Sequence, residues 1–101
     1  MANKQIYYQV FVKGNSIIDV KKPVDDNDPT IGRLQTSPPL NAGKVKREIV
    51  KQEGYPFDPT TALYLVAGDD APAKDDQIIE GQYGADQEHP IAVVFKGDPT
   101  A

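Results

Sequence analysis

The chain has 101 residues, of which 39% are hydrophobic and 26% charged, and its formal net charge is −4. This length suits one small globular domain with a modest core and little room for a deep catalytic cleft. The acidic balance argues against generic nucleic-acid binding, which needs a basic surface. The absence of cysteine excludes disulfides, thiolate catalysis and cysteine-ligated zinc.

The sequence shows neither a membrane-spanning stretch nor a secretory signal, and a secreted natural protein would carry its signal outside this sequence. No stretch approaches the roughly 20 apolar residues needed to cross a bilayer. The first residues lead straight into strand-like sequence without a secretory signal. We therefore expect a cytoplasmic or nuclear protein that contacts no membrane, binds no nucleic acid, needs no cofactor and is a monomer.

Residues 5–13 predict a strand, because apolar side chains recur there at every second position. Gly14-Asn15 is a strong turn signal, and a second short strand is predicted over residues 16–20. The two strands are expected to form a hairpin. One set of alternating positions in the first strand holds Ile6, Tyr8, Val10 and Val12, and the other holds Tyr7, Gln9, Phe11 and Lys13.

Residues 21–40 predict a long insert loop. The segment carries several aspartates together with Pro23, Pro29 and the pair Pro38-Pro39, which oppose regular structure. At most, residues 30–35 are expected to form one helical turn. A loop of this length in a small domain is expected to be either functional or flexible.

The clearest helix is predicted from Ala42 to Glu53. Asn41 is a good N-cap, and Gly54 stands where a left-handed C-terminal glycine belongs. Val45 and Ile49 share one face of this helix. A helix with one apolar stripe must pack on an apolar surface, which the strands supply.

Two further strands are predicted after the helix, over residues 61–67 and 91–95. A polar loop separates them, and residues 96–101 are expected to be a flexible tail. One helix can cover only one face of a sheet. We therefore predict an α+β domain over residues 1–101, with a mixed four- to five-stranded sheet packed on one main helix.

The predicted helix and its exit resemble those of ubiquitin. The matching string is Val45-Lys46-Arg47-Glu48-Ile49-Val50-Lys51-Gln52-Glu53-Gly54-Tyr55-Pro56-Phe57-Asp58. It shares with ubiquitin a Val-Lys pair, an isoleucine three positions later, and a Glu-Gly-x-Pro-x-Asp exit. Ala67-Gly68 is similar to the turn after ubiquitin's third strand, if two extra residues are allowed. The resemblance implies a ubiquitin-like β-grasp fold and a function in protein–protein interaction.

The chain departs from conjugated ubiquitin-like modifiers in one respect. Such modifiers resemble one another in a terminal Gly-Gly tail, whereas this chain has Lys96-Gly97-Asp98-Pro99. We therefore expect a non-conjugated interaction module within a larger protein, an adaptor rather than an enzyme. One alternative is an N-terminal trafficking domain of a Crinkler-type effector, to which Leu63-Tyr64-Leu65-Val66-Ala67-Gly68 is similar. Another is a modifier or sulfur carrier that lacks its Gly-Gly tail here.

The open face of the sheet is the first candidate site. The resemblance places Leu65 at an exposed position beside the turn, with Val94, or alternatively Val93, from the last strand. Leu63 from the same apolar run is a further candidate contact. The opposite strand parity, with Leu65 in the core and Tyr64 outside, remains open, because a shift of one residue exchanges the faces. Either parity leaves apolar side chains on the face that the helix does not cover.

A basic stripe on the helix is the second candidate, formed by Lys44, Arg47 and Lys51 at spacings of three and four. Lys44 and Arg47 lie near the helix N-terminus, where the dipole disfavours cations. The stripe suggests docking to an acidic partner, and its alternative is a solvated helix face.

The sequence offers no catalytic or metal-binding pattern. The acidic cluster Asp25-Asp26-Asn27-Asp28 lacks the glycine and glutamate that a calcium loop requires. His89 is the only histidine, and alone it cannot build a triad or a histidine metal site. We therefore predict no catalytic, cofactor-binding or metal-binding residue.

Overall fold

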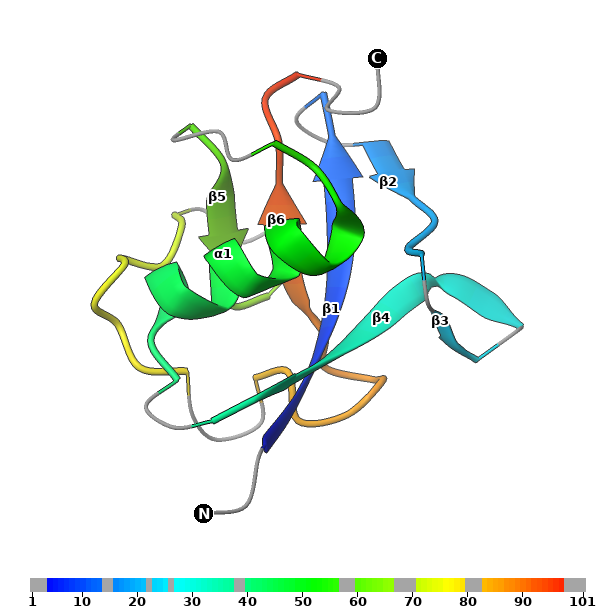
Figure 1. Ribbon diagram of the computed structural model, residues 1–101, viewed down its shortest axis with the longest axis horizontal. Helices are drawn as coiled ribbons and strands as arrows, with labels where there is room; N and C mark the ends of the chain where they lie inside the picture. The colour runs from blue at the N-terminus through cyan, green and yellow to red at the C-terminus, as the bar shows by residue number, and fades with distance from the viewer. Residues whose placement is uncertain are drawn as a thin grey trace.

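A computed structural model describes residues 4–13, 16–21, 23–25, 27–37, 40–56, 60–66, 71–79 and 83–97 (Figure 1). Its helix and strands in chain order are β1 (Lys4–Val12), β2 (Ser16–Ile18), β3 (Pro23–Asp25), β4 (Asp28–Thr36), α1 (Ala42–Glu53), β5 (Ala62–Tyr64) and β6 (Ile91–Val94). The Ala67-Gly68 turn of the ubiquitin resemblance and the predicted Gly14-Asn15 turn lie outside the described residues.

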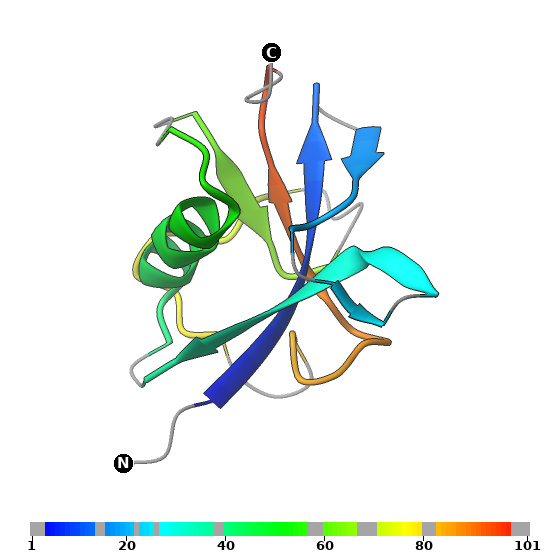
Figure 2. The ribbon, with the colours of Figure 1, turned by 45° about the vertical axis from the view of Figure 1, so that its right-hand side comes forward.

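The strands form one mixed sheet in the order β3-β4-β1-β6-β5, with β2 pairing the distal half of β1. The central pair, β1 and β6, is parallel, and the other pairs are antiparallel. Helix α1 lies across one side of this sheet (Figure 2). The predicted α+β class, with a mixed sheet packed on one helix, is confirmed and is consistent with a β-grasp-like fold. The described residues form six strands, more than the four to five predicted.

The prediction of a loop over residues 21–40 is wrong. Most of this segment forms β3 and β4, and β4 pairs with β1 from Lys4 to Gln9. Pro29 is tolerated because it lies before the stretch of β4 that pairs with β1, Ile31 to Thr36, so its missing N–H costs that ladder no bond. Its carbonyl oxygen accepts a hydrogen bond from the Val20 N–H at 2.9 Å. The predicted helical turn over residues 30–35 is likewise wrong, since those residues belong to β4.

Gly32 gives β4 room for a large side chain of β1. It is the Cα partner of Tyr8, and a Cβ atom on Gly32 would lie 2.6 Å from Cζ of the Tyr8 ring. A side chain there would displace the ring, so glycine is required at this position. Tyr8 itself is completely buried.

Helix α1 begins and ends at the predicted residues. The Asn41 side chain accepts a hydrogen bond from the Lys44 N–H at 2.8 Å. Gly54 ends the helix in the left-handed region with φ of 75°, and the Tyr55 N–H bonds the Val50 carbonyl at 3.1 Å. Capping chemistry that is local in sequence therefore sets both ends of this helix.

The hydrophobic core lies between α1 and the near face of the sheet. Every second residue of β1 enters it, as the alternation predicted. The strands contribute Ile6, Tyr8, Val10, Val12, Leu34, Leu63, Ile91 and Val93, and the helix contributes Ala42, Val45, Ile49 and Val50. The other face of the sheet is therefore defined by the intervening residues.

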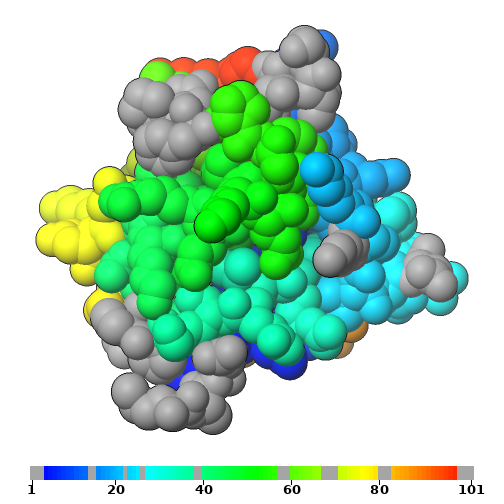
Figure 3. Space-filling view, viewed as in Figure 1, coloured from blue at the N-terminus to red at the C-terminus, as the bar shows by residue number. Residues whose placement is uncertain are grey.

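Three helix side chains spaced four residues apart fasten α1 along β4. β3 pairs with β4 as far as Gly32, so the rest of that edge of β4 is not covered by a strand. The helix bonds this stretch instead, and Figure 3 shows α1 and β4 lying directly against each other. The bonds run from Gln52 Nε2 to the Arg33 carbonyl (3.0 Å), from Thr36 Oγ1 to Glu48 Oε2 (2.6 Å) and from Lys44 Nζ to the Ser37 carbonyl (2.7 Å).

A buried polar cluster locks the C-terminal end of α1 to the sheet. The Tyr8 hydroxyl donates to Glu53 Oε2 at 2.6 Å, and the Lys21 N–H donates to Glu53 Oε1 at 3.0 Å. Gln52 Nε2 donates to the Tyr8 hydroxyl at 2.8 Å. Burial raises the pKa of Tyr8 well above its usual range, and the hydrogen bond to Glu53 raises it further.

The remaining strands are shorter than predicted. β5 ends at Tyr64 and β6 at Val94, whereas the sequence suggested strands over residues 61–67 and 91–95. The predicted flexible tail begins at Lys96, and its described part is tied down at Gly97, whose carbonyl accepts from the Lys13 N–H at 2.8 Å. Residues 98–101 lie outside the described residues.

Candidate functional site

The face of the sheet opposite α1 carries a row of apolar side chains that crosses four strands. The register places Phe11 opposite Ile17 of β2 and Val94 of β6, and Val94 opposite Ala62 of β5. Cross-strand partners lie on the same face of a sheet. Ile17 is 42% exposed and the other three side chains are half-buried. We call Ile17, Phe11, Val94 and Ala62 the apolar row.

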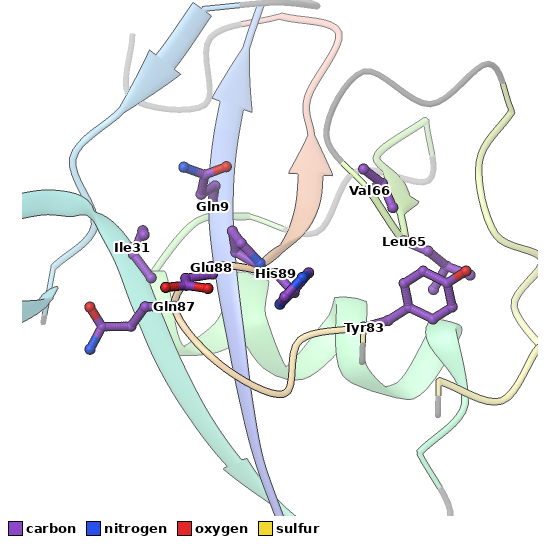
Figure 4. A pocket seen from close by; sticks show the side chains of 9 residues that line it. Gln9, Ile31, Leu65, Val66, Tyr83, Gln87, Glu88 and His89 are labelled. Atoms are coloured by element: carbon purple, nitrogen blue, oxygen red, sulfur yellow. The ribbon is translucent and has the colours of Figure 1, made fainter. Parts of the chain in front are cut away.

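A second row lies beside the first, nearer the start of β6. Tyr64 is opposite Ala92, which is opposite Gln9, which in turn is opposite Ile31 of β4. This second row borders a hollow of about 340 Å³ (Figure 4). The hollow is lined by Gln9, Ile31, Leu65, Val66, Tyr83, Gln87, Glu88, His89 and Pro90.

The turn before β6 forms one wall of the hollow and is held by its own hydrogen bonds. The Gly84 N–H donates to the His89 carbonyl at 2.6 Å, and the Glu88 N–H donates to Asp86 Oδ1 at 3.0 Å. His89 Nδ1 lies 2.9 Å from the same Asp86 oxygen. The contact with His89 foremost, and then the hydrogen bond from the Glu88 N–H, hold the pKa of Asp86 below its usual range.

The three predicted sheet residues have different positions. Val94 lies on the open face, as predicted, within the apolar row. Leu63 is 1% exposed and packs in the core, so its prediction as a partner contact is wrong. It faces the helix because its register partner, Val93, is also a core residue.

Leu65 is half-buried rather than central to an exposed patch. It packs against the core and also lines the hollow, together with Val66, which is 50% exposed. The structure does not pair Leu65 with Val94, because the β5 partner of Val94 is Ala62. Ala62 and Tyr64 are the β5 residues that lie on the open face, and Leu65, which follows β5, lines the hollow beside them.

The three residues of the predicted basic stripe differ in their exposure and contacts. Lys44 is half-buried and donates a hydrogen bond to the carbonyl of Ser37, the residue directly after β4, so it helps to hold α1 beside the end of that strand. Arg47 and Lys51 are exposed, and neither forms an ion pair with another described residue. All three lie on the helix, in the layer opposite the apolar row.

Sequence reasoning missed Phe11 and Ile17 as surface residues. The signal was present, because the alternation that puts Val10 and Val12 in the core also puts Phe11 outside. The hollow left no comparable signal, since its lining comes from segments that only the sheet register brings together.

The described residues contain no group of three or more histidine or acidic side chains that could hold a metal ion. No described helix has the length and apolarity that crossing a membrane requires. The buried Tyr8 and Glu53 are bonded to each other and to the backbone, so their polar atoms serve the packing of the fold.

Comparison with family models, curated proteins and solved structures finds no match to this chain. The resemblance to ubiquitin-like domains therefore stays a prediction from the string that begins at Val45, and function has to be argued from the open face itself.

Proposed function

We propose that this chain is a non-conjugated ubiquitin-like interaction module that binds other proteins through the open face of its sheet. The apolar row carries the proposal. A sheet face lined by Ile17, Phe11 and Val94 keeps apolar surface in water, although alternation allows polar residues there. Contiguous exposed apolar surface is characteristic of protein-binding sites.

Bonds along the outer side of β5 and along the end of β4 favour docking on the face over addition of a strand at these two places. The Leu63 carbonyl, on the outer side of β5, accepts from the Ala73 N–H at 2.7 Å. The Thr61 carbonyl accepts from the buried Lys46 Nζ at 3.1 Å. On β4, the Arg33 carbonyl is taken by Gln52. These carbonyls are not free to pair with a partner strand.

The fold supports the ubiquitin-like part of the proposal. In the strand order β4-β1-β6-β5, the central strands β1 and β6 are parallel, and β4 and β5 lie on either side of them. Helix α1 follows β4 in the chain, and β4 pairs with β1. The Asn41 cap precedes the string that resembles ubiquitin, and the Gly54 helix stop lies within it. We propose that affinity is modest, since a small apolar surface without deep anchors gives weak and reversible binding.

The test is the affinity of the protein for a panel of purified ubiquitin-binding modules, measured by isothermal titration calorimetry. Val94→Asp and Ile17→Asp place a charge against the apolar surface of the partner. Each is expected to weaken binding by about tenfold or more, which corresponds to about 1.4 kcal/mol. Arg47→Glu, on the exposed helix face, is the control and is expected to change affinity little.

Two results would contradict the proposal. One is unchanged binding by a folded Val94→Asp variant with loss of binding by Arg47→Glu, which would move the site to the helix. The other is a well-folded protein that binds no module of the panel. The effector-domain and modifier alternatives stay predictions, since no described contact favours either one.

A further inference from the structure

The hollow beside the apolar row has an apolar body and one charged end. Ile31, Leu65 and Val66 supply aliphatic surface, and the Tyr83 ring and Pro90 extend it. Figure 4 shows Leu65 and Tyr83 on one side and Glu88 with Gln87 on the other, beside Ile31. The polar side chains of Gln9 and His89 also line the hollow. An occupant with an apolar stem and a polar end fits this mixed lining.

Glu88 sets the sign of that polar end. It is the one residue in the described lining with a full charge at neutral pH when histidine is neutral. No described cation lies within ion-pair distance of its carboxylate. The neighbouring Asp86 is engaged by His89, so Glu88 is the carboxylate left for a ligand. A cation is the complementary group.

The size of the hollow restricts the occupant further. Its volume of about 340 Å³ lies at the small end of the roughly 300–1,000 Å³ typical of ligand pockets. Such a space suits one long side chain better than a large cofactor. Lysine and arginine combine an aliphatic stem that packs on apolar surface with a cationic head.

We infer that the hollow receives a lysine or arginine side chain of the bound partner, with its stem along Ile31, Leu65 and Tyr83 and its cationic head at Glu88. This inference rests on the proposed function, because the hollow adjoins the apolar row on the same face. It assigns the partner a basic residue next to the apolar side chains that cover Val94 and Phe11. The helix stripe had suggested an acidic partner instead.

The experiment titrates ¹⁵N-labelled protein with blocked amino acids and follows the backbone amide signals. The probes are N-acetyl-arginine methylamide, the lysine equivalent, and the neutral citrulline and norleucine equivalents. The arginine or lysine probe is expected to shift the amide signals of Gln9, Ile31, Leu65 and His89. The citrulline and norleucine probes are expected to bind with affinities up to about fivefold lower, which is the contribution of an exposed ion pair. Comparing arginine with lysine identifies the preferred head group.

Glu88→Gln is expected to remove that difference, so that arginine binds no better than citrulline. Asp76→Asn, which removes an exposed carboxylate away from the hollow, is the charge-matched control and is expected to leave the difference intact. Equal binding of citrulline and arginine by the unmodified protein, or shifts that do not involve the hollow, would overturn the inference.

The two proposals fail in different ways. In one outcome, Val94→Asp weakens binding to the panel of modules, Glu88→Gln does not, and neither arginine nor lysine shifts the amide signals at the hollow. This outcome overturns the inference and leaves the proposed function standing. Arginine binding at the hollow without any effect of Val94→Asp on the panel keeps the basic-side-chain site and overturns the apolar row.

Discussion

The two faces of the sheet are built from residues adjacent in sequence. They differ in how far their apolar side chains are buried and in whether their charged groups have partners within the chain. On the helix side, Val93 is fully buried, and the polar atoms of Glu53 are bonded by Tyr8 and Lys21. On the open side, Val94 keeps part of its surface in water, and the Glu88 carboxylate has no described cationic partner.

This difference separates residues that hold the fold from residues that are available to a partner. The covered face has its hydrogen bonds and apolar contacts within the chain, so changes there are expected to reduce stability. On the open face Ala92 and Ile31 are buried, but the apolar row retains apolar surface and Glu88 retains a charge that no described ion pair uses. Changes on that face are expected to affect binding first.

The adjacent valines give the sharpest contrast and the largest expected effect. Val93→Asp buries an unpaired charge in the core and is expected to cost more than about 4 kcal/mol in the free energy of unfolding, which leaves the protein largely unfolded. Val94→Asp, on the open face, is expected to cost about 1 kcal/mol or less. Urea denaturation followed by circular dichroism measures both, and similar losses would contradict the assignment of faces.

Removal of the Tyr8 hydroxyl tests the buried cluster. Tyr8→Phe deprives Glu53 Oε2 of its donor and is expected to cost about 1–3 kcal/mol at neutral pH. Urea denaturation of the variant beside the unmodified protein checks this value.

The same pair of proteins tests the pH dependence. The pKa of Tyr8 is higher in the folded than in the unfolded chain, so its contribution is fully present below the ordinary tyrosine pKa of 10.0 and is lost as pH rises above it. The unmodified protein is therefore expected to lose stability above pH 10 more steeply than Tyr8→Phe. Parallel stability curves from pH 8 to 11.5 would refute this account.

The fastening of α1 to β4 is a smaller contribution. Gln52→Ala removes the bonds to the Arg33 carbonyl and the Tyr8 hydroxyl and is expected to cost about 1 kcal/mol. Lys51→Ala, at the exposed neighbouring position, is the control, with an expected change within about 0.5 kcal/mol. Thermal unfolding of the two variants decides whether these helix–strand bonds stabilise the fold.

The smallest expected effect lies in the wall of the hollow. His89→Ala removes the first contact that lowers the pKa of Asp86, so that pKa is expected to rise toward the ordinary value of 3.8. A carboxyl ¹³C NMR titration from pH 2 to 6 measures it. An unchanged Asp86 pKa would mean that His89 does not organise this turn.

The helix could be predicted to the residue because its signals are local. Asn41, Gly54 and the Val45–Ile49 spacing act within the helix itself. Strand β4 could not, because Pro29 and the preceding aspartates suggested a loop, and the pairing of β4 with β1 that overrides them is made at a distance in sequence. Gly32 was uninformative until the Tyr8 ring was seen to occupy its space.

The candidate site was predictable only in part for related reasons. Val94 came from the resemblance to ubiquitin, with Val93 as its alternative, because the apolar run Ile91–Val94 has no two-residue period. Phe11 was recoverable from the alternation in β1. The continuous apolar run from Leu63 to Val66 has no two-residue period, so parity could not be assigned, and Leu63 was misplaced. The hollow is lined by residues of β1, β4, the segment after β5 and the turn before β6, which only the folded chain brings together. No single segment of the sequence could therefore predict it.

The most direct test of the central claim is a map of partner contacts on the two faces of the sheet. The measurement is a methyl NMR titration of the protein, labelled at valine, leucine and isoleucine, with the tightest-binding module of the ubiquitin-binding panel. The account predicts large shifts at Val94 and Ile17 and small shifts at Val93 and Val45. Shifts centred on the helix residues, with Val94 and Ile17 unmoved, would contradict it.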